Sequence, residues 1–395
     1  MRPMPHEPLL LTGTGRLLTG RGVISPWAMQ LRDGVVAWIG SPADAPKGER
    51  TADLGAALVT PGLVDAHTHP VYAGDRSDEA AARLAGATYD GGGILRTVRA
   101  TRDASDDELL MLIEGRLRTA LGGGTTTIEC KSGYGLTTAD ELRALRLIRL
   151  AASRVGVRVV RTFLGAHAVP PGFTPDAYVD LIVEEMLPAV AAEADFCDVF
   201  CDRGFFSVAQ AERILRAAAS HGIGLRMHAE QLARTGAVEM AVGLGVTSVD
   251  HLEQLDPSGV AALAGSSTVA TLLPGPALVM RDSLPPARAL LDAGVRVALA
   301  SDANAGTFGS CSMPLVIGLG ATLLGMSVDE ALTAATVGGA ASLGLGEICG
   351  ELRPGLAADL IAWDAEHEGA FALHLGGVRP GQVWVGGVPV LPVGG

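Results

Sequence analysis

The chain has 395 residues, 48% of them hydrophobic, and a formal net charge of −13. The apolar content supplies a large core and excludes general disorder, and the acidic balance without a Lys/Arg cluster argues against nucleic acid as a partner. No apolar run approaches the roughly 20 residues of a membrane span, and the N-terminus lacks the apolar stretch of a secretory signal.

Short apolar runs rich in β-branched residues alternate with helical patterns between about residues 58 and 345. Eight runs are predicted as strands: Leu58–His67, Thr125–Cys130, Val157–His167, Asp195–Cys201, Gly224–Glu230, Val246–Glu253, Thr268–Pro274 and Arg296–Asn304. Ser105, the capping-box pattern Thr138–Glu141 and Thr174-Pro175 predict helix starts between them. The alternation favours an α/β fold, a (β/α)₈ TIM barrel, over an open sheet, because no GxGxxG turn follows the first run.

Two glycine-rich β-like segments flank this region. One contains Asp33-Gly34 between apolar runs, and the other contains Ala358–Trp363 and Val383–Val390. Such patterns are typical of hairpins. We therefore predict that residues 1–57 and 346–395 form one composite small β domain, and that residues 58–345 form the barrel.

The strongest local signal is the pair His67 and His69, in the segment Pro61–Pro70. Residues two apart on an extended strand project to the same side, so both imidazoles can bind one ion. Neutral imidazole suits zinc, iron or nickel. Taken alone, the pair could equally be a chance occurrence on a surface loop.

Other residues of metal-ligand type fall at the ends of later runs. His228 ends the fifth, His251 the sixth and Asp302 the eighth. The C-terminal ends of TIM-barrel strands meet on one face, so these side chains are expected to join His67 and His69. Each alone could be a core histidine or a helix cap, but together they predict one catalytic ion, held by His67, His69, His228 and Asp302.

Such an ion lowers the pKa of water and polarises a carbonyl or amidine carbon, which is the chemistry of a hydrolase. Asp302 could bind the ion and also accept the proton of the water. His251, if it is not itself a ligand, would stabilise the oxyanion or relay protons. His167 ends the third run and is expected to face the same site.

This ligand pattern resembles the amidohydrolase superfamily, whose members often carry a small β-sandwich made from both chain ends. Within it, the chain resembles the imidazolonepropionase family of histidine degradation along nearly the whole barrel. The narrower resemblance rests on ten stretches: Gly74–Ser77, Leu84–Tyr89, Gly91–Leu95, Lys131–Leu136, Thr162–Pro170, Cys197–Cys201, His228–Gln231, Asp250–Glu253, Ala270–Gly275 and Ser301–Thr307.

The resemblance implies hydrolysis of the ring amide of 4-imidazolone-5-propanoate to N-formimidoyl-L-glutamate, with one Zn²⁺ or Fe ion per chain. It also implies a set of residues that contact substrate or flank Asp302: Arg76, Tyr134, His167, Gln231, Asn304, Gly306 and Thr307. A guanidinium suits the propanoate group. Without the resemblance, Arg76 would be interpreted as a surface ion pair and Tyr134 as a turn residue.

Two positions depart from the family pattern. Some members carry Glu where this chain has Gln231. An amide cannot act as a base, so Gln231 is expected to orient substrate or water, and Asp302 and His251 are expected to do the base work. Ala305 replaces a usual Pro, which puts the rigidity of that loop in doubt while the contacting side chains remain.

Three alternatives stay open: a two-metal cyclic amidase, an aminohydrolase deaminase, and a barrel that binds a ligand without turnover. The fourth run has no Lys to bridge two metals, since Lys131 follows the second run. Asp198 or Cys201 would have to bridge instead, so one metal is the simpler interpretation. The ligand set accepts zinc and iron alike.

The expected partner is a small-molecule substrate, with neither nucleic acid nor membrane involved. Five cysteines at scattered spacings, without a CxxC pair, predict a reducing, cytoplasmic location. The sequence does not fix the oligomeric state; a homodimer is the default expectation, because two-fold dimers are the commonest assemblies.

Overall fold

The computed structural model describes residues 8–47, 50–86 and 92–390. Its central sheet has eight parallel strands, in the order β15-β14-β13-β12-β11-β10-β9-β8. The strands are β8 (Leu63–Asp65), β9 (Thr125–Lys131), β10 (Arg158–Ala166), β11 (Phe196–Cys201), β12 (Gly224–Ala229), β13 (Ser248–His251), β14 (Val269–Leu272) and β15 (Val297–Leu299). Each lies within one of the eight predicted runs or extends it by one residue, so the eight-stranded barrel is confirmed, although the first run is divided between two sheets.

The sheet closes just beyond the last residues of β8 and β15. Thr68 and Ala303 form a parallel bridge there. The amide of Asp302 donates to the carbonyl of His67 at 3.0 Å, and the amide of His69 donates to the carbonyl of Ala303 at 2.9 Å. The barrel is therefore closed by the two segments that carry the His-x-His pair and Asp302, and its closure brings them side by side.

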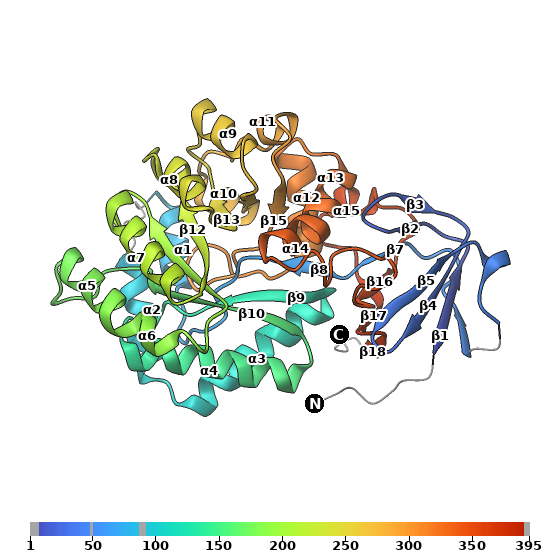
Figure 1. Cartoon of the computed structure of the whole chain (residues 1–395), viewed down its shortest axis with the longest axis horizontal. Helices are drawn as coiled ribbons and strands as arrows, with labels where there is room; N and C mark the ends of the chain where they lie inside the picture. Colours follow the sequence, from blue (N-terminus) through green and yellow to red (C-terminus); the bar gives the residue numbers. More distant parts are fainter. Residues whose placement is uncertain (1–7, 48–49, 87–91, 391–395) are drawn as a thin grey trace.

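Helices connect the strands and surround the barrel (Figure 1). They are α1 (Ser77–Leu84), α2 (Gly92–Asp103), α3 (Asp106–Gly122), α4 (Thr138–Val155), α5 (Pro175–Leu181), η2 (Ile182–Met186), α6 (Leu187–Val190), α7 (Val208–Ser220), α8 (Ala237–Leu244), α9 (Pro257–Ala264), α10 (Pro274–Met280), α11 (Ala287–Asp292), α12 (Met313–Leu323), α13 (Val328–Thr333), η3 (Ala334–Gly338) and α14 (Gly339–Ser342). Ser105 and Thr174 cap α3 and α5, as predicted.

The predicted start of α4 was wrong by one residue. Thr137, not Thr138, is the N-cap, and its hydroxyl accepts from the amide of Asp140. Glu141 does not complete a capping box. Its buried carboxylate instead accepts hydrogen bonds from backbone amides of the loop that precedes the helix. The Glu141 side chain therefore binds this loop and not the N-cap residue.

The first predicted strand is two strands in two different sheets. β7 (Val59–Pro61) belongs to the terminal β region and β8 to the barrel. Between them, the amide of Gly62 donates to the carbonyl of Asp359 at 2.8 Å, outside both ladders. A Cβ at position 62 would overlap the side chain of Thr126 on β9, so only glycine allows the chain to pass this close to the barrel.

The chain ends form two sheets beside the barrel, with the first strands next to the last ones (Figure 1). One sheet has the order β5-β4-β1-β6 and the other β18-β17-β16-β7-β2-β3. Their strands are β1 (Leu9–Gly13), β2 (Leu17–Leu18), β3 (Val23–Ile24), β4 (Trp27–Arg32), β5 (Val35–Gly40), β6 (Arg50–Asp53), β16 (Leu360–Trp363), β17 (Pro380–Val385) and β18 (Val388–Val390), and the short helices η1 (Pro42–Asp44) and α15 (Ala370–Leu373) lie outside the sheets.

Side chains of both terminal sheets share one apolar core, which includes Leu11, Met29, Val59, Leu360 and Trp384. The small β-sandwich expected from the family resemblance is thus present, and it draws strands from both ends of the chain. The proposed boundaries after residues 57 and 345 stay a prediction. Among the described residues, no helix combines the length and the apolar character needed to cross a bilayer.

Candidate metal centre and active-site cavity

The four predicted metal ligands meet at the C-terminal end of the barrel. The Nε2 atoms of His67 and His69 lie 3.2 Å apart. Oδ1 of Asp302 lies 3.3 Å from Nε2 of His69 and 3.6 Å from Nε2 of His67. Ligand atoms of His67, His69 and His228 lie within 4.8 Å of one another, and so do those of His67, His251 and Asp302. His251 therefore lies as close to this cluster as the predicted ligands do.

Buried carboxylates on neighbouring strands orient two of these imidazoles. Nδ1 of His67 hydrogen-bonds Oδ2 of Asp250 at 2.7 Å, and Nδ1 of His228 hydrogen-bonds Oδ1 of Asp198 at 3.0 Å. Each bond places the ring proton on Nδ1 and directs the lone pair of Nε2 towards the cluster. This is the outer-shell arrangement that usually accompanies a bound metal ion.

Each carboxylate is itself paired with a fully buried cation. Arg226 donates to Oδ2 of Asp250 at 3.0 Å, and Lys131 donates to Oδ2 of Asp198 at 2.7 Å. Lys131 also donates to Oε1 of Glu129 at 2.8 Å. Two buried cations thus hold three buried carboxylates below the cluster. The two-metal alternative, which would need Asp198 or Cys201 as a bridge, loses support at Asp198, because both oxygens of this carboxylate already have partners.

The protonation states suit a metal ion. Burial lowers the pKa of His67 well below its usual range, and the Lys131 cation lowers it further. Burial also lowers the pKa of His228. Burial alone would raise the pKa of Asp302, but its contact with His69 outweighs this and keeps the carboxyl ionised. Because the ring proton of His67 lies on Nδ1, its Nε2 lone pair faces the Asp302 carboxylate, an arrangement that a cation between them would stabilise.

The backbone at this centre is strained. Asp302 has φ 51° and His251 has φ 84°, in the left-handed region that residues other than glycine rarely adopt. Asp65 holds the segment before Asp302, because its carboxylate accepts from the amide (2.9 Å) and the hydroxyl (2.6 Å) of Ser301. The strain turns both functional side chains inward at the ends of their strands.

A small cavity opens above the cluster. It is lined by His69, Arg76, Ile94, Tyr134, His167, Phe200, His228, Gln231, His251, Asp302, Asn304 and Thr307. All but two of the predicted site residues are in this lining. The exceptions are His67, which lies beneath it, and Gly306, which lies behind Arg76. Residues 87–91, which belong to two of the family-like stretches, lie outside the described residues.

Arg76 is buried in the cavity wall, and the plane of its guanidinium is fixed by hydrogen bonds. Its Nε and Nη2 donate to the two oxygens of Glu79 at 2.9 and 2.6 Å. Arg83 also donates to Glu79, at 2.9 Å, and to the carbonyl of Gly306 at 2.5 Å. A Cβ at position 306 would overlap the Arg76 guanidinium, which explains the glycine. Glu79 thus holds the guanidinium of Arg76 in the cavity wall.

Tyr134 and His167 face each other across the opposite wall, with ring centroids 5.1 Å apart. Nδ1 of His167 hydrogen-bonds the carbonyl of Gly133 at 2.9 Å, and burial lowers its pKa well below the usual range. The ring is therefore neutral, with the lone pair on Nε2. Glu141 fixes the Tyr134 loop by accepting from the amides of Gly133, Gly135 and Leu136 at 2.8–2.9 Å.

The Asn304 side chain is engaged in hydrogen bonds within its own loop and is not presented freely to a substrate. Its Nδ2 donates to the carbonyl of Asp302 and to Oγ1 of Thr307, both at 2.7 Å. Its Oδ1 accepts from the amides of Gly306 and Thr307 at 2.7 and 2.8 Å. The Asn304 side chain therefore ties the loop after β15 together, and it supplies the rigidity that Ala305 put in doubt.

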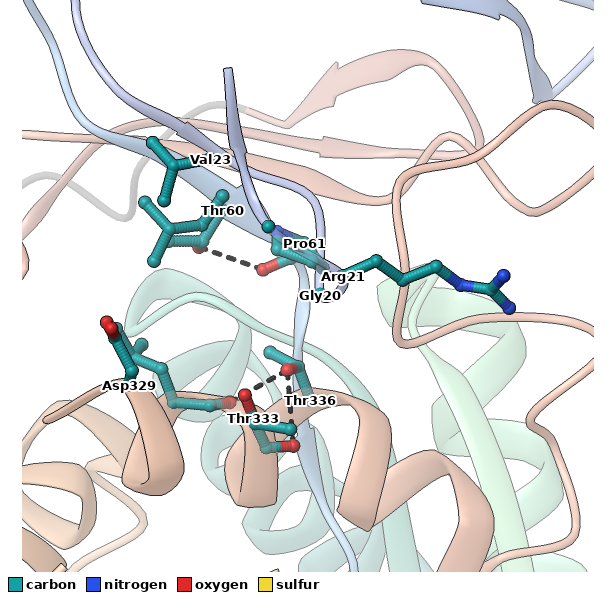
Figure 2. A pocket seen from close by; sticks show the side chains of 11 residues that line it. Gly20, Arg21, Val23, Thr60, Pro61, Asp329, Thr333 and Thr336 are labelled. Atoms are coloured by element: carbon teal, nitrogen blue, oxygen red, sulfur yellow. Dashed lines mark hydrogen bonds between the residues drawn. The ribbon is translucent and has the colours of Figure 1, made fainter. Parts of the chain in front are cut away.

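A second cavity, of ≈ 640 Å³, lies at the junction of the β-sandwich and the barrel (Figure 2). Asp329, Thr333 and Thr336 border it from α13 and η3, and Thr60 and Val23 border it from the strands. Its described lining contains neither histidine nor cysteine and only one carboxylate. It has no counterpart of the His/Asp cluster, so the barrel mouth is the candidate active site.

Comparisons with known proteins agree with this geometry. Residues 58–390 match the Amidohydrolase family. The chain belongs to this family. It is 46% identical over 387 residues to imidazolonepropionase from Saccharopolyspora erythraea, which covers 96% of this chain and 98% of that relative. Imidazolonepropionase from Salinispora tropica is 47% identical, with 96% and 98% covered. The expected membership among the imidazolonepropionases is confirmed. The expectation that the chain is a hydrolase is confirmed with it.

Solved amidohydrolase structures share the fold. An adenosine deaminase from Xanthomonas campestris with bound zinc superposes with a TM-score of 0.73 at 19% identity, covering 97% of this chain and 92% of that one. A variant of atrazine chlorohydrolase from Arthrobacter aurescens, complexed with zinc and atraton, gives a TM-score of 0.77 at 21% identity, with 97% and 95% covered. At these identities the likeness concerns the fold alone.

Proposed function

We propose that this amidohydrolase hydrolyses the ring amide of 4-imidazolone-5-propanoate to N-formimidoyl-L-glutamate, a step of histidine catabolism that consumes one water. The observation that carries the proposal is the His/Asp cluster beneath a cavity whose lining includes the Arg76 guanidinium. Support also comes from imidazolonepropionases at 44–47% identity, which match 90–96% of this chain. The cytoplasmic location and the homodimer stay predictions.

His67, His69, His228 and Asp302 are the proposed ligands of one divalent Zn or Fe ion. When bound, such an ion lowers the pKa of a water molecule and polarises the amide carbonyl. Lys131 and Asp198 are engaged with each other, which favours one ion over two.

Asp302 is the proposed acceptor of the proton that the attacking water loses. Its carboxylate lies within 4.8 Å of a ring nitrogen of His251. His251 can therefore pass that proton on to the substrate ring nitrogen that leaves when the amide bond breaks. Burial lowers the pKa of His251, but the nearby Glu253 outweighs this and raises it to about 8. His251 is thus suited to exchange a proton near neutral pH.

Neutral groups on the remaining walls are proposed to hold the imidazolone ring. The hydrogen bond to Gly133 leaves Nε2 of His167 as an acceptor for a ring N–H. Gln231 lies on the cavity wall, and its backbone amide is fixed by Oδ2 of Asp202 at 2.8 Å. Its side-chain amide can orient substrate or water but cannot accept a proton.

Arg76 is the proposed partner of the substrate propanoate, and we predict that its replacement by lysine raises KM. Glu79 fixes the plane of the guanidinium, and lysine cannot reproduce a forked interaction with a carboxylate. A charge-assisted hydrogen bond contributes about 1.5–3 kcal/mol, so KM is expected to rise about 10- to 100-fold. Steady-state kinetics of Arg76→Lys should show a smaller change in kcat.

The matched control for this prediction is Arg96→Lys. Arg96 pairs with Asp78 at 2.8 Å on the surface, where both side chains are about half exposed or more. The same chemical change should leave KM unaltered there. A wild-type KM in Arg76→Lys would remove Arg76 from the substrate site.

The direct test of the proposed function is turnover. The purified protein is incubated with 4-imidazolone-5-propanoate, loss of the imidazolone absorbance is followed, and bound metal is quantified in the same sample. Turnover with about one metal per chain, abolished by a chelator and restored by Zn²⁺ or Fe²⁺, supports the proposal. No turnover in a fully metallated sample would overturn the substrate, and cyclic amides and amidines would then be screened.

A further inference from the structure

Lys131 lies fully buried at the end of β9, below the metal centre. Its Nζ donates to Oε1 of Glu129 at 2.8 Å and to Oδ2 of Asp198 at 2.7 Å. A buried ammonium between two carboxylates is costly to desolvate and persists only with such partners. Nothing in the proposed reaction uses this residue, so its position needs another explanation.

One arm of the Lys131 network reaches His228. Oδ2 of Asp198 accepts from Lys131, while Oδ1 of Asp198 accepts from both the backbone amide (3.1 Å) and Nδ1 (3.0 Å) of His228. The ammonium therefore fixes the carboxylate that sets the tautomer and the ring orientation of this ligand. Without it, one oxygen of Asp198 would lose its only charged partner.

The other arm reaches the His-x-His segment. Thr68 separates His67 and His69, and its amide donates to Oε2 of Glu129 at 3.0 Å. Its hydroxyl donates to the Glu129 carbonyl at 2.5 Å, and its carbonyl accepts from the backbone amide of Lys131 at 3.0 Å. Every polar group of Thr68 is thus bound by Glu129 or Lys131.

We propose that Lys131 is a positioning residue that sets the His-x-His pair relative to His228. It acts through Glu129 and Thr68 on one side and through Asp198 on the other. The inference rests on the metal site of the proposed function. It also assigns Lys131 a role different from that of a metal-bridging lysine, because carboxylation requires a neutral amine and this ammonium is held by two carboxylates.

The test measures metal binding without substrate. Wild-type protein and Lys131→Met are stripped of metal and titrated with Co²⁺ against a competing chelator, and the visible absorption of bound Co²⁺ is recorded. We expect Lys131→Met to bind Co²⁺ about 10- to 100-fold more weakly, the usual cost of losing an outer-shell partner, with a changed ligand-field spectrum. Circular dichroism of the metal-free proteins checks that both are folded.

The control variant is Arg16→Met, which breaks the ion pair between Arg16 and Glu368. Its Co²⁺ affinity and spectrum should match the wild type, because neither residue contacts the network. A folded Lys131→Met protein with wild-type affinity and spectrum would overturn the proposal. Failure of the substrate test leaves this experiment unaffected, since Co²⁺ binding is measured in the absence of any substrate.

Two near-isosteric variants keep the proposal testable if Lys131→Met does not fold. Glu129→Gln and Asp198→Asn each remove the charge of one arm while keeping the side-chain volume. Each should weaken Co²⁺ binding, and the two losses should combine to less than their product, because both carboxylates share the same ammonium. Wild-type affinity in both variants would also overturn the proposal.

Discussion

Replacement of Asp302 by asparagine is expected to lower kcat about 10²- to 10⁴-fold. The carboxylate is the proposed acceptor of the proton lost by the attacking water, and a positioned general base contributes a factor of about 10²–10⁴. Asn keeps the shape and the strained φ of 51°, a region that asparagine tolerates well. The loss therefore reports the missing charge and basicity, not a rearranged loop.

The measurement compares initial rates of imidazolone loss per bound metal ion. Asp302→Asn also removes a charged metal ligand, so total metal content should fall, and normalisation separates this loss from the chemical step. Asp256→Asn serves as the matched control. Asp256 caps α9 by accepting from the amide of Gly259 at 3.0 Å, and asparagine caps helices equally well. Normal turnover per metal in Asp302→Asn would refute the assignment of the base.

Much of the barrel could be predicted because its signals are local. Each barrel strand is a short apolar run followed by a helix start, and His228, His251 and Asp302 each fall at the end of such a run. The geometry of a parallel barrel then places all strand ends on one face. The roles of the site residues stay predictions, but the structure does bring the named side chains to one cavity.

The buried ion pairs beneath the site were not predicted, because each depends on residues far apart in the sequence. Arg226 and Asp250, on neighbouring strands, meet only through the barrel register. A signal was nevertheless present: Glu129 and Lys131 are two apart in a strand whose residues are all buried, so both point to the same side. Charged residues inside such a run require buried partners of opposite charge, but the run itself does not show which distant residues supply them.

Two local errors have a similar origin. The apolar pattern of residues 58–67 predicts one strand, but Gly62 divides this segment between two sheets. The division follows from contacts with Thr126 and Asp359, which no local pattern of residues 58–67 reveals. Likewise, Glu141 has the spacing of a capping box from Thr138, but the glycine-rich loop before it offers three amides in reach of its carboxylate.

Asp250→Ala is expected to lower the free energy of unfolding of the metal-free protein by about 3–5 kcal/mol. Oδ2 of Asp250 accepts from Arg226 at 3.0 Å and from Nδ1 of His67 at 2.7 Å, and both charged side chains of the pair are fully buried. Removing the carboxylate leaves the Arg226 guanidinium without its counter-ion inside the barrel. Breaking a buried pair in this way carries a cost of that size.

Urea unfolding in the presence of a chelator measures the effect, and a double variant isolates its cause. Arg226→Met with Asp250→Ala removes both charges and should recover part of the lost stability, because no uncompensated charge remains. Asp292→Ala, which breaks an exposed pair with Arg288, should change the stability by no more than about 0.5 kcal/mol. If Asp250→Ala alone unfolded at the wild-type urea concentration, the buried pair would not stabilise the barrel, and its remaining role would be to orient His67.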